Sequence, residues 1–404
     1  MVTLREIPGG ITAPAGFRAA GVPAGIKASG APDVALIVPE SGSTGAALFT
    51  TNQVQAAPVG VSREHLARSG GRVAAVLVNS GCANACTGPD GLEVTRASAQ
   101  AVATRLGCPV EQVLIASTGV IGVALDRGKL LAGIDRAADA LSATGGGHAA
   151  RAILTTDLGP KEHAVEVRTG NGVFRVGGMA KGAGMIEPLL ATMLAFVTTD
   201  ARVDAVLLHE ALAASADDTL NAITVDGECS TNDTLVALAS GASGVQITRG
   251  AGLDALTAGM RAVCHKLALD IVRGGEGATR LVAVRVTGAH DRAAAKQAAR
   301  TIANSLLVKT AIHGGDPNWG RLVAAAGRSG VPFDLSRALV RVGPVVLFRD
   351  GLPFDEAAPE AARVLQGTEI EIQVDLGTGG ADEATVWTCD LSAEYVRING
   401  EYRT

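Results

Sequence analysis

Aromatic residues are scarce in this sequence of 404 residues, at 3%. Proteins that hold unpaired bases stack them on aromatic side chains, so this content argues against single-stranded nucleic acid as a ligand. The formal net charge is -5, so the chain also lacks the excess of basic residues that neutralises a row of phosphates. We therefore expect no nucleic-acid partner.

Long hydrophobic runs are absent as well. The longest, at 185–197, is interrupted by Glu187 and reaches about 13 residues, short of the roughly 20 that a membrane-spanning helix needs. The first residues contain no apolar stretch of roughly 7 to 15 residues behind a basic cluster, which is the pattern of a secretory signal. The sequence predicts a cytoplasmic protein without a membrane segment.

Cysteine is sparse and scattered through the chain. No second Cys or His pair stands at zinc-finger distance from Cys82 and Cys86, and no two of the seven histidines have metal-ligand spacing. We therefore expect reduced thiols, no disulfide framework and no metal site. The six cysteines are Cys82, Cys86, Cys108, Cys229, Cys264 and Cys389.

Apolar residues, by contrast, make up 47% of the chain, enough to bury a large core. Short runs rich in Val, Ile and Leu predict strands at 34–38, 73–78, 113–116, 281–286 and 345–348. Apolar residues spaced three and four apart predict helices at 92–106, 129–141, 203–223, 253–272 and 292–307. This interleaving of strands and helices predicts a layered α/β fold.

The most unusual segment is 177–200. It places Lys181 among closely spaced glycines and then carries Thr192 inside an apolar stretch. Glycine marks places where the backbone turns sharply or approaches another group closely, so the composition suggests an active-site loop. Composition alone also fits a glycine-rich loop that leads into a buried strand, with Thr192 as an ordinary strand residue.

The run from Lys181 to Leu194 resembles the signature of the ornithine acetyltransferase family, K-G-x-G-M-x-x-P-x-x-A-T-M-L, in which the chain cleaves itself between Ala and Thr. Cys82 stands where Asn is frequent, and Leu189 and Leu190 where Asn-Met is common. Further family motifs follow in order and extend the resemblance over nearly the whole chain: 79–88, 117–122, 152–157, 224–227, 230–234, 309–311, 316–321 and 398–404.

The resemblance implies a self-cleaving acetyltransferase of arginine biosynthesis, with a layered sandwich of helices and sheets and an N-terminal threonine nucleophile. Cleavage between Ala191 and Thr192 would give an alpha chain, 1–191, and a beta chain, 192–404. These fragments would assemble as an α2β2 heterotetramer. The enzyme would move the acetyl group of N2-acetylornithine to glutamate, and its partners would be small-molecule amino-acid substrates.

A free amino terminus explains why such an enzyme would cut itself. A threonine hydroxyl is a poor nucleophile near neutrality, and the α-amine of the same residue can activate it. That amine exists only after cleavage, and its ordinary pKa of about 7.7 to 8.0 allows it to accept a proton in the cell.

The family's site residues carry over to matching positions of this sequence. Thr118 and Gly119 match the oxyanion-hole pair, which stabilises the negative charge of the tetrahedral intermediate. Lys181 can meet a carboxylate or lower the pKa of a neighbouring amine, and Glu276 can attract the cationic side chain of ornithine. The positions that match substrate contacts are Thr155, Lys181, Thr192, Glu276, Asn399 and Thr404.

The family requires no metal or tightly bound cofactor. Some members also accept acetyl-coenzyme A as the acetyl donor, and this sequence leaves that point open. Two other functions remain open as well. One is a self-cleaving amidohydrolase or aminopeptidase of similar fold, which would pass the acyl group to water. The other is an amino-acid-binding protein that never cleaves itself.

Overall fold

The computed structural model describes residues 2–187 and 193–401, and within these residues the strands form three sheets. The largest has seven strands, in the order β1 (Thr3–Ile7), β8 (Lys161–Thr169), β9 (Gly172–Lys181), β10 (Leu194–Thr199), β11 (Thr234–Ala239), β4 (Ser43–Phe49) and β5 (Arg72–Val73). The second has four, in the order β2 (Phe17–Val22), β3 (Val34–Pro39), β6 (Ala75–Cys82) and β7 (Val113–Val120). The third has six, in the order β15 (Leu352–Pro353), β14 (Val345–Arg349), β13 (Leu339–Val342), β16 (Glu369–Asp375), β12 (Leu281–Ala289) and β17 (Asp382–Cys389).

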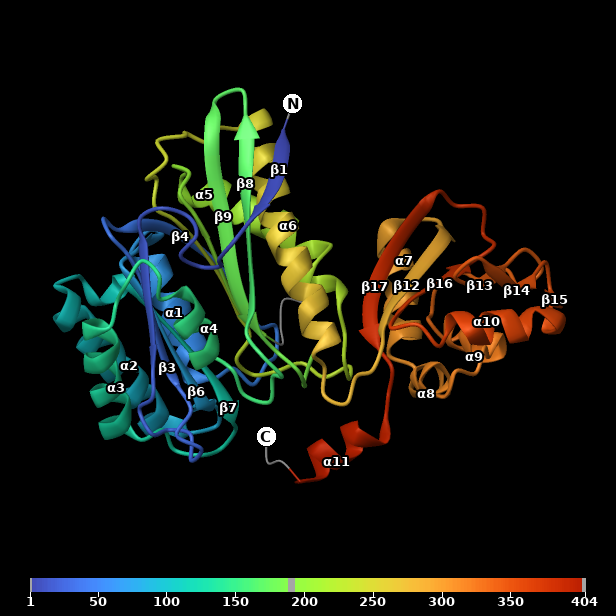
Figure 1. Cartoon of the computed structure of the whole chain (residues 1–404), viewed down its shortest axis with the longest axis horizontal. Coiled ribbons are helices and arrows are strands. Elements are labelled where there is room, and N and C mark those ends of the chain that lie inside the picture. The colour runs from blue at the N-terminus through green and yellow to red at the C-terminus, as the bar shows by residue number, and fades with distance from the viewer. Residues whose placement is uncertain (1, 188–192, 402–404) are drawn as a thin grey trace.

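Helices cover the sheets, as Figure 1 shows. The α-helices are α1 (Ala57–Arg68), α2 (Gly88–Leu106), α3 (Arg127–Asp139), α4 (Gly146–Ala152), α5 (Ala205–Asp217), α6 (Ala251–Arg273), α7 (Arg292–Ala303), α8 (Leu306–Gly314), α9 (Trp319–Gly327), α10 (Ala358–Val364) and α11 (Ala393–Glu401). The part of the chain that the structure describes also contains three short 3-10 helices, η1 (Val110–Gln112), η2 (Leu220–Ala222) and η3 (Asp355–Ala357). The predicted layered α/β fold is confirmed.

The four-stranded and seven-stranded sheets pack face to face over one apolar core. That core combines Val76 and Val78 of β6 with Met179 of β9 and Phe196 of β10, and α4 contributes Ala149. Alternate strand residues point to opposite faces, so the other face of each sheet needs its own cover. Helices α2 and α3 cover the outer face of the four-stranded sheet, whereas α5 and α6 cover that of the seven-stranded sheet.

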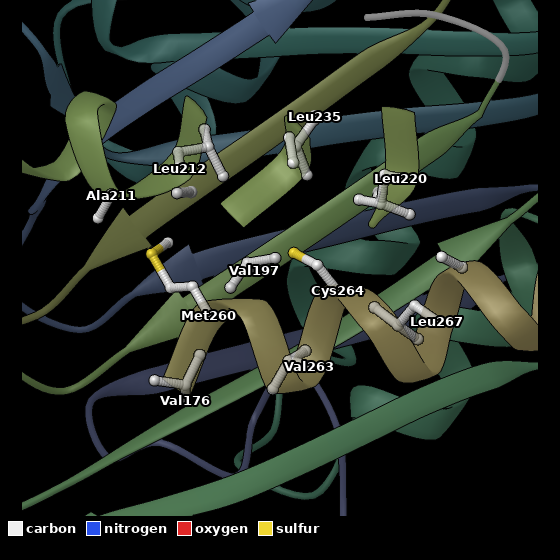
Figure 2. Close-up of a cluster of buried hydrophobic side chains, with 14 of the residues drawn as sticks. Val176, Val197, Ala211, Leu212, Leu220, Leu235, Met260, Val263, Cys264 and Leu267 are labelled. Carbon is white, nitrogen blue, oxygen red and sulfur yellow. The ribbon is translucent and has the colours of Figure 1, made fainter. Parts of the chain in front are cut away.

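Helix α6 is amphipathic because its apolar residues recur on one face. Met260, Val263, Cys264 and Leu267 recur three and four residues apart and are all fully buried. Figure 2 shows these side chains directed into a cluster with Val197 and other apolar residues of the neighbouring strands and helices. Burying a side chain of this size contributes about 1.5–3 kcal/mol relative to exposure, so the cluster firmly attaches α6 to the sheet.

Two predicted helices end earlier than the sequence pattern indicates. The run 203–223 forms α5 only to Asp217 and then the 3-10 helix η2, because Leu220 of η2 still contributes to the same core and so continues the apolar spacing. The run 292–307 is divided between α7 and α8, since Ser305 adopts an extended backbone with ψ 112°. Apolar periodicity alone does not detect these breaks.

The seven-stranded sheet contains strands from both sides of the predicted cleavage point. Strand β9 ends at Lys181, the chain leaves the sheet, and β10 returns beside it with Leu194 opposite Lys181. On the other side of β10, Leu194 pairs with Thr234 of β11. The two ends of the segment that carries the predicted cleavage point are therefore fixed next to each other in one sheet.

Candidate active site

A cavity of about 300 Å³ lies where the ends of β7 and β9 meet the start of β10 and helix α11. Six of the residues that the sequence assigned to the site line it: Thr118, Gly119, Thr155, Lys181, Glu276 and Asn399. The other assigned positions, Ala191, Thr192 and Thr404, lie outside the described residues. Met193, the residue that follows Thr192 in the sequence, also lines the cavity.

Thr118 and Gly119 stand at the end of β7, beside the parallel strand β6. Gly119 is opposite Gly81 and has a φ of 129°, which residues with a Cβ rarely adopt. A Cβ at this position would overlap the backbone of Gly81 and lie 2.6 Å from the nitrogen of Cys82. Glycine is therefore required here for steric reasons, independently of any catalytic role.

Replacing Gly119 with alanine is expected to lower the free energy of unfolding by about 1–3 kcal/mol from this overlap alone. Gly122 is the matched control, because its φ is also positive, at 75°, but a Cβ there would meet no atom within 4 Å. Gly122→Ala should lower the free energy of unfolding only by the cost of a positive φ for alanine, about 1 kcal/mol. Urea denaturation of both variants measures the difference, and equal stabilities would contradict the packing described here.

Polar side chains behind this pair join three of the sequence motifs. Ser117 donates its hydroxyl to Asn79 Oδ1 at 2.5 Å, and Asn79 Nδ2 donates to the carbonyl of Cys82 at 2.9 Å. From the third motif, Asn232 Nδ2 donates to the carbonyls of Ala83 and Ser117 at 2.6 and 2.8 Å. These buried bonds hold the ends of β6 and β7 in place. They give the polar residues of the motifs at 79–88, 117–122 and 230–234 a common structural role.

Lys181 points its ammonium group at this strand end, where Nζ donates to Thr118 Oγ1 at 3.2 Å. Its side chain is buried, and burial lowers the pKa of Lys181, although the nearby carboxylate of Asp157 acts in the opposite direction. The ammonium group of Lys181 and the hydroxyl of Thr118 therefore place several hydrogen-bond donors side by side in the cavity.

Asp157 is a residue of the site that the sequence did not assign. Its carboxylate accepts hydrogen bonds from the backbone nitrogens of Gly182 at 2.7 Å and Thr155 at 3.2 Å, and it forms an ion pair with Lys161. Burial raises the pKa of Asp157, but the charges of Lys181 and Lys161 outweigh burial and leave the pKa lowered. The carboxylate thus positions the backbone of the assigned residue Thr155 and of Gly182, which follows the assigned residue Lys181.

Glu276 and Asn399 also line the cavity and contact each other. Asn399 Nδ2, on α11, donates to Glu276 Oε2 at 2.8 Å. The backbone of Gly184 lies against the same carboxylate, and a Cβ on Gly184 would stand 2.5 Å from Glu276 Oε2. Figure 1 shows why α11 can contribute, since it leaves β17 and runs back toward the middle of the molecule.

Asp226 and Tyr395 also line the cavity and were not assigned from the sequence. The motif 224–227 identified the region of Asp226 but gave that residue no role. Tyr395 had no signal other than its place in the carboxyl-terminal segment. The sequence alone does not indicate that a tyrosine belongs to a site, and Tyr395 is recognised only because the fold brings α11 to the cavity.

Within residues 2–187 and 193–401, no group of three or more His, Cys, Asp and Glu side chains is arranged to hold a metal ion. All six cysteines, each in the described part of the chain, are free thiols. No helix in that part of the chain is long and apolar enough to cross a membrane.

Comparison with known proteins identifies close relatives. Residues 18–404 match the model of the ArgJ family. An arginine biosynthesis bifunctional protein ArgJ of Synechococcus sp. is 52% identical, over 99% of this chain and 99% of the relative. The protein of the same name from Symbiobacterium thermophilum is 48% identical, over 98% and 99%.

Among solved structures, an ornithine acetyltransferase complexed with ornithine from Mycobacterium tuberculosis is 47% identical, covering 47% of this chain and 100% of that chain with a TM-score of 0.43. The family model and the relatives extend over nearly the whole length and include every motif that meets at the cavity. This chain belongs to the ArgJ family.

Proposed function

We propose that this protein transfers the acetyl group of N2-acetylornithine to glutamate through an acetyl ester on Thr192. The observation that carries the proposal is the cavity, where Thr118, Gly119 and Lys181 lie together with Met193. Its family membership and relatives named as arginine biosynthesis bifunctional proteins support the pathway.

The first step is self-cleavage, and the fold supports it. The hydroxyl oxygen of Thr192 attacks the carbonyl carbon of Ala191, and the C–N bond breaks as the nitrogen takes a proton. The acyl group is then an ester on Thr192, which water hydrolyses to the carboxylate of Ala191 and a free hydroxyl. The products are an alpha chain, 1–191, and a beta chain, 192–404, whose new α-amine serves as the base.

The second stage uses the same atoms on the substrate. The Thr192 hydroxyl attacks the acetyl carbonyl of acetylornithine and passes its proton to the Thr192 amine. That proton goes to the departing amine, so ornithine leaves and the acetyl group remains on Thr192. The α-amine of glutamate then attacks the ester carbonyl, which gives N-acetylglutamate and restores the hydroxyl, with ping-pong kinetics as the expected pattern.

The cavity supports distinct roles for the other residues. Thr118 and Gly119 would stabilise the oxyanion of both tetrahedral intermediates, where losing one donor typically costs about 2.7–4 kcal/mol of barrier. Lys181, next to Thr118, would add positive charge at that point. Glu276, with Asn399, would attract the cationic end of ornithine. Thr155 and Thr404 would complete the substrate contacts.

Assembly and context are part of the same proposal. The two fragments would associate as an α2β2 heterotetramer in the cytoplasm, without a tightly bound cofactor. Strand β10, which follows Thr192, pairs with β9 of the other fragment over six residue pairs. Such pairing supports an alpha chain and a beta chain that stay together after cleavage. Acetyl-coenzyme A is a candidate second donor of the acetyl group.

A product assay separates this proposal from the hydrolase alternative. Purified protein is mixed with acetylornithine, with and without glutamate, and ornithine, acetylglutamate and acetate are quantified. We expect stoichiometric ornithine and acetylglutamate only when glutamate is present. Steady release of acetate that does not depend on glutamate would instead assign the protein to the hydrolases.

A further inference from the structure

The backbone just before the proposed cleavage segment is bound closely to the segment 224–229. The carbonyl of Ile186 accepts from the nitrogen of Val225 at 2.7 Å and from the hydroxyl of Thr224 at 3.0 Å. Ile186 also forms an isolated β-bridge with Cys229. One residue further on, the carboxylate of Glu187 accepts from Asn304 Nδ2 at 2.7 Å. The chain is therefore fixed at 186–187.

The chain is fixed again immediately after that segment. The carbonyl of Met193 accepts from the nitrogen of Thr234 at 3.0 Å, and Leu194 enters the sheet between Lys181 and Thr234. Only residues 188–192 separate the two fixed points. The backbone on both sides of the proposed cleavage point is therefore held by hydrogen bonds to the rest of the fold.

Asp226 is the group that shapes the first of these points. Its Oδ2 accepts from the nitrogen of Met185 at 2.7 Å, and its Oδ1 accepts from the nitrogen of Ile186 at 2.8 Å. Two successive backbone N–H groups that converge on one anion form a nest, which requires alternating right-handed and left-handed backbone conformations. A carboxylate is charged and so makes stronger bonds to these donors than a neutral oxygen makes.

Met185 has the left-handed backbone conformation that this nest demands, with φ 58°. For a residue other than glycine, asparagine or aspartate this conformation costs about 1–2 kcal/mol. Strain of this kind persists only where the surroundings impose it, and it is concentrated at functional sites. The bond that Met185 N donates to Asp226 holds this residue directly, and the bonds at Ile186 hold the next residue.

We propose that Asp226 is a positioning residue for self-cleavage, whose carboxylate holds the strained backbone at Met185 and Ile186, where the chain enters the segment that carries the proposed scissile bond. This inference rests on the proposed self-cleavage at Ala191 and Thr192. It adds to that function a residue whose described contacts lie at the start of the segment that carries the proposed cleavage point. Two further groups donate to the same carboxylate: the backbone nitrogen of Glu228 to Oδ1 at 3.3 Å and the hydroxyl of Tyr395 to Oδ2 at 3.2 Å.

The test compares self-cleavage rates of full-length variants by mass spectrometry of samples taken after synthesis. Asp226→Asn offers one oxygen in place of two and should slow cleavage at least tenfold, with a melting temperature close to that of the wild type. Tyr395→Phe is the comparison variant, since it removes one hydroxyl bond to Asp226 and leaves both backbone bonds of the nest intact, so it should slow cleavage less than Asp226→Asn does. Asp226→Asn/Met185→Gly should recover part of the lost rate, because glycine adopts the left-handed conformation without help.

The outcomes separate this inference from the function on which it rests. A wild-type chain that stays intact would refute self-cleavage itself. A wild type that cleaves, beside an Asp226→Asn variant that is folded and cleaves equally fast, would overturn the role of Asp226 alone. If Asp226→Asn does not fold, Asp226→Glu takes its place: it keeps the charge, moves the carboxylate by one methylene and should slow cleavage several-fold, and a wild-type rate would overturn the inference.

Discussion

Replacing Thr192 with alanine is expected to leave one uncut chain of 404 residues and to abolish acetyl transfer. Alanine has no hydroxyl to attack the carbonyl of Ala191, so neither the fragments nor the free amine would form. Denaturing electrophoresis measures the first effect, and ornithine release from acetylornithine measures the second. Because one residue supplies both the nucleophile and the base, we expect no residual turnover through the acetyl-enzyme.

Thr192→Ser is the matched control for that variant. Serine keeps the hydroxyl and, after cleavage, the amine, so both cleavage and transfer should continue at a reduced rate. A Thr192→Ala protein that transfers acetyl groups at the wild-type rate would contradict the mechanism, whether or not its chain is cut.

Replacing Asp157 with asparagine should lower the free energy of unfolding by about 3–5 kcal/mol, because it leaves the buried ammonium of Lys161 without its counter-charge. The side chains of this pair are 0% and 6% exposed. Asp270→Asn is the control, since Asp270 and Lys266 have the same i,i+4 spacing but are 22% and 44% exposed. Asp270 also pairs with Arg273, and exposed helix pairs of this kind contribute about 0.3–0.5 kcal/mol each, so the control should lose much less than Asp157→Asn. Equal losses in the two variants by urea denaturation would contradict the burial of the Asp157–Lys161 pair.

The effect of Asp157 should depend on pH in a definite direction. The folded protein lowers the pKa of this carboxyl from its ordinary 3.8. Such a group stabilises the fold fully above its unfolded pKa, and the contribution is lost as the pH falls through the lowered folded value. The stability difference between wild type and Asp157→Asn should therefore be constant near neutrality and shrink at acid pH. A difference that grows on acidification would contradict the assigned direction.

Much of the fold was accessible from the sequence because burial leaves a periodic pattern. The helix predicted at 253–272 corresponds to α6, Ala251–Arg273, where apolar spacing is unbroken. The strand predicted at 281–286 corresponds to β12, Leu281–Ala289. Boundaries such as the one at Ser305 were missed, because a change in backbone conformation at one residue does not disturb the apolar pattern around it.

The site could be predicted only in part, for a different reason. Thr118, Lys181 and Glu276 were found because they match motifs of a known family, and their proximity came only with the fold. Asp157 and Asp226 act through backbone nitrogens of other residues, and no residue type marks such a role in a sequence. Carboxylates of this kind are recognised only when the donors around them are known.

Mass spectrometry of the purified wild-type protein, before and after addition of acetylornithine without glutamate, tests the central claim most directly. The account predicts two fragments, 1–191 and 192–404, and a gain of one acetyl group that is confined to the larger fragment and located at its first residue. An intact chain in protein that turns over substrate, or an acetyl group on any other residue, would contradict it.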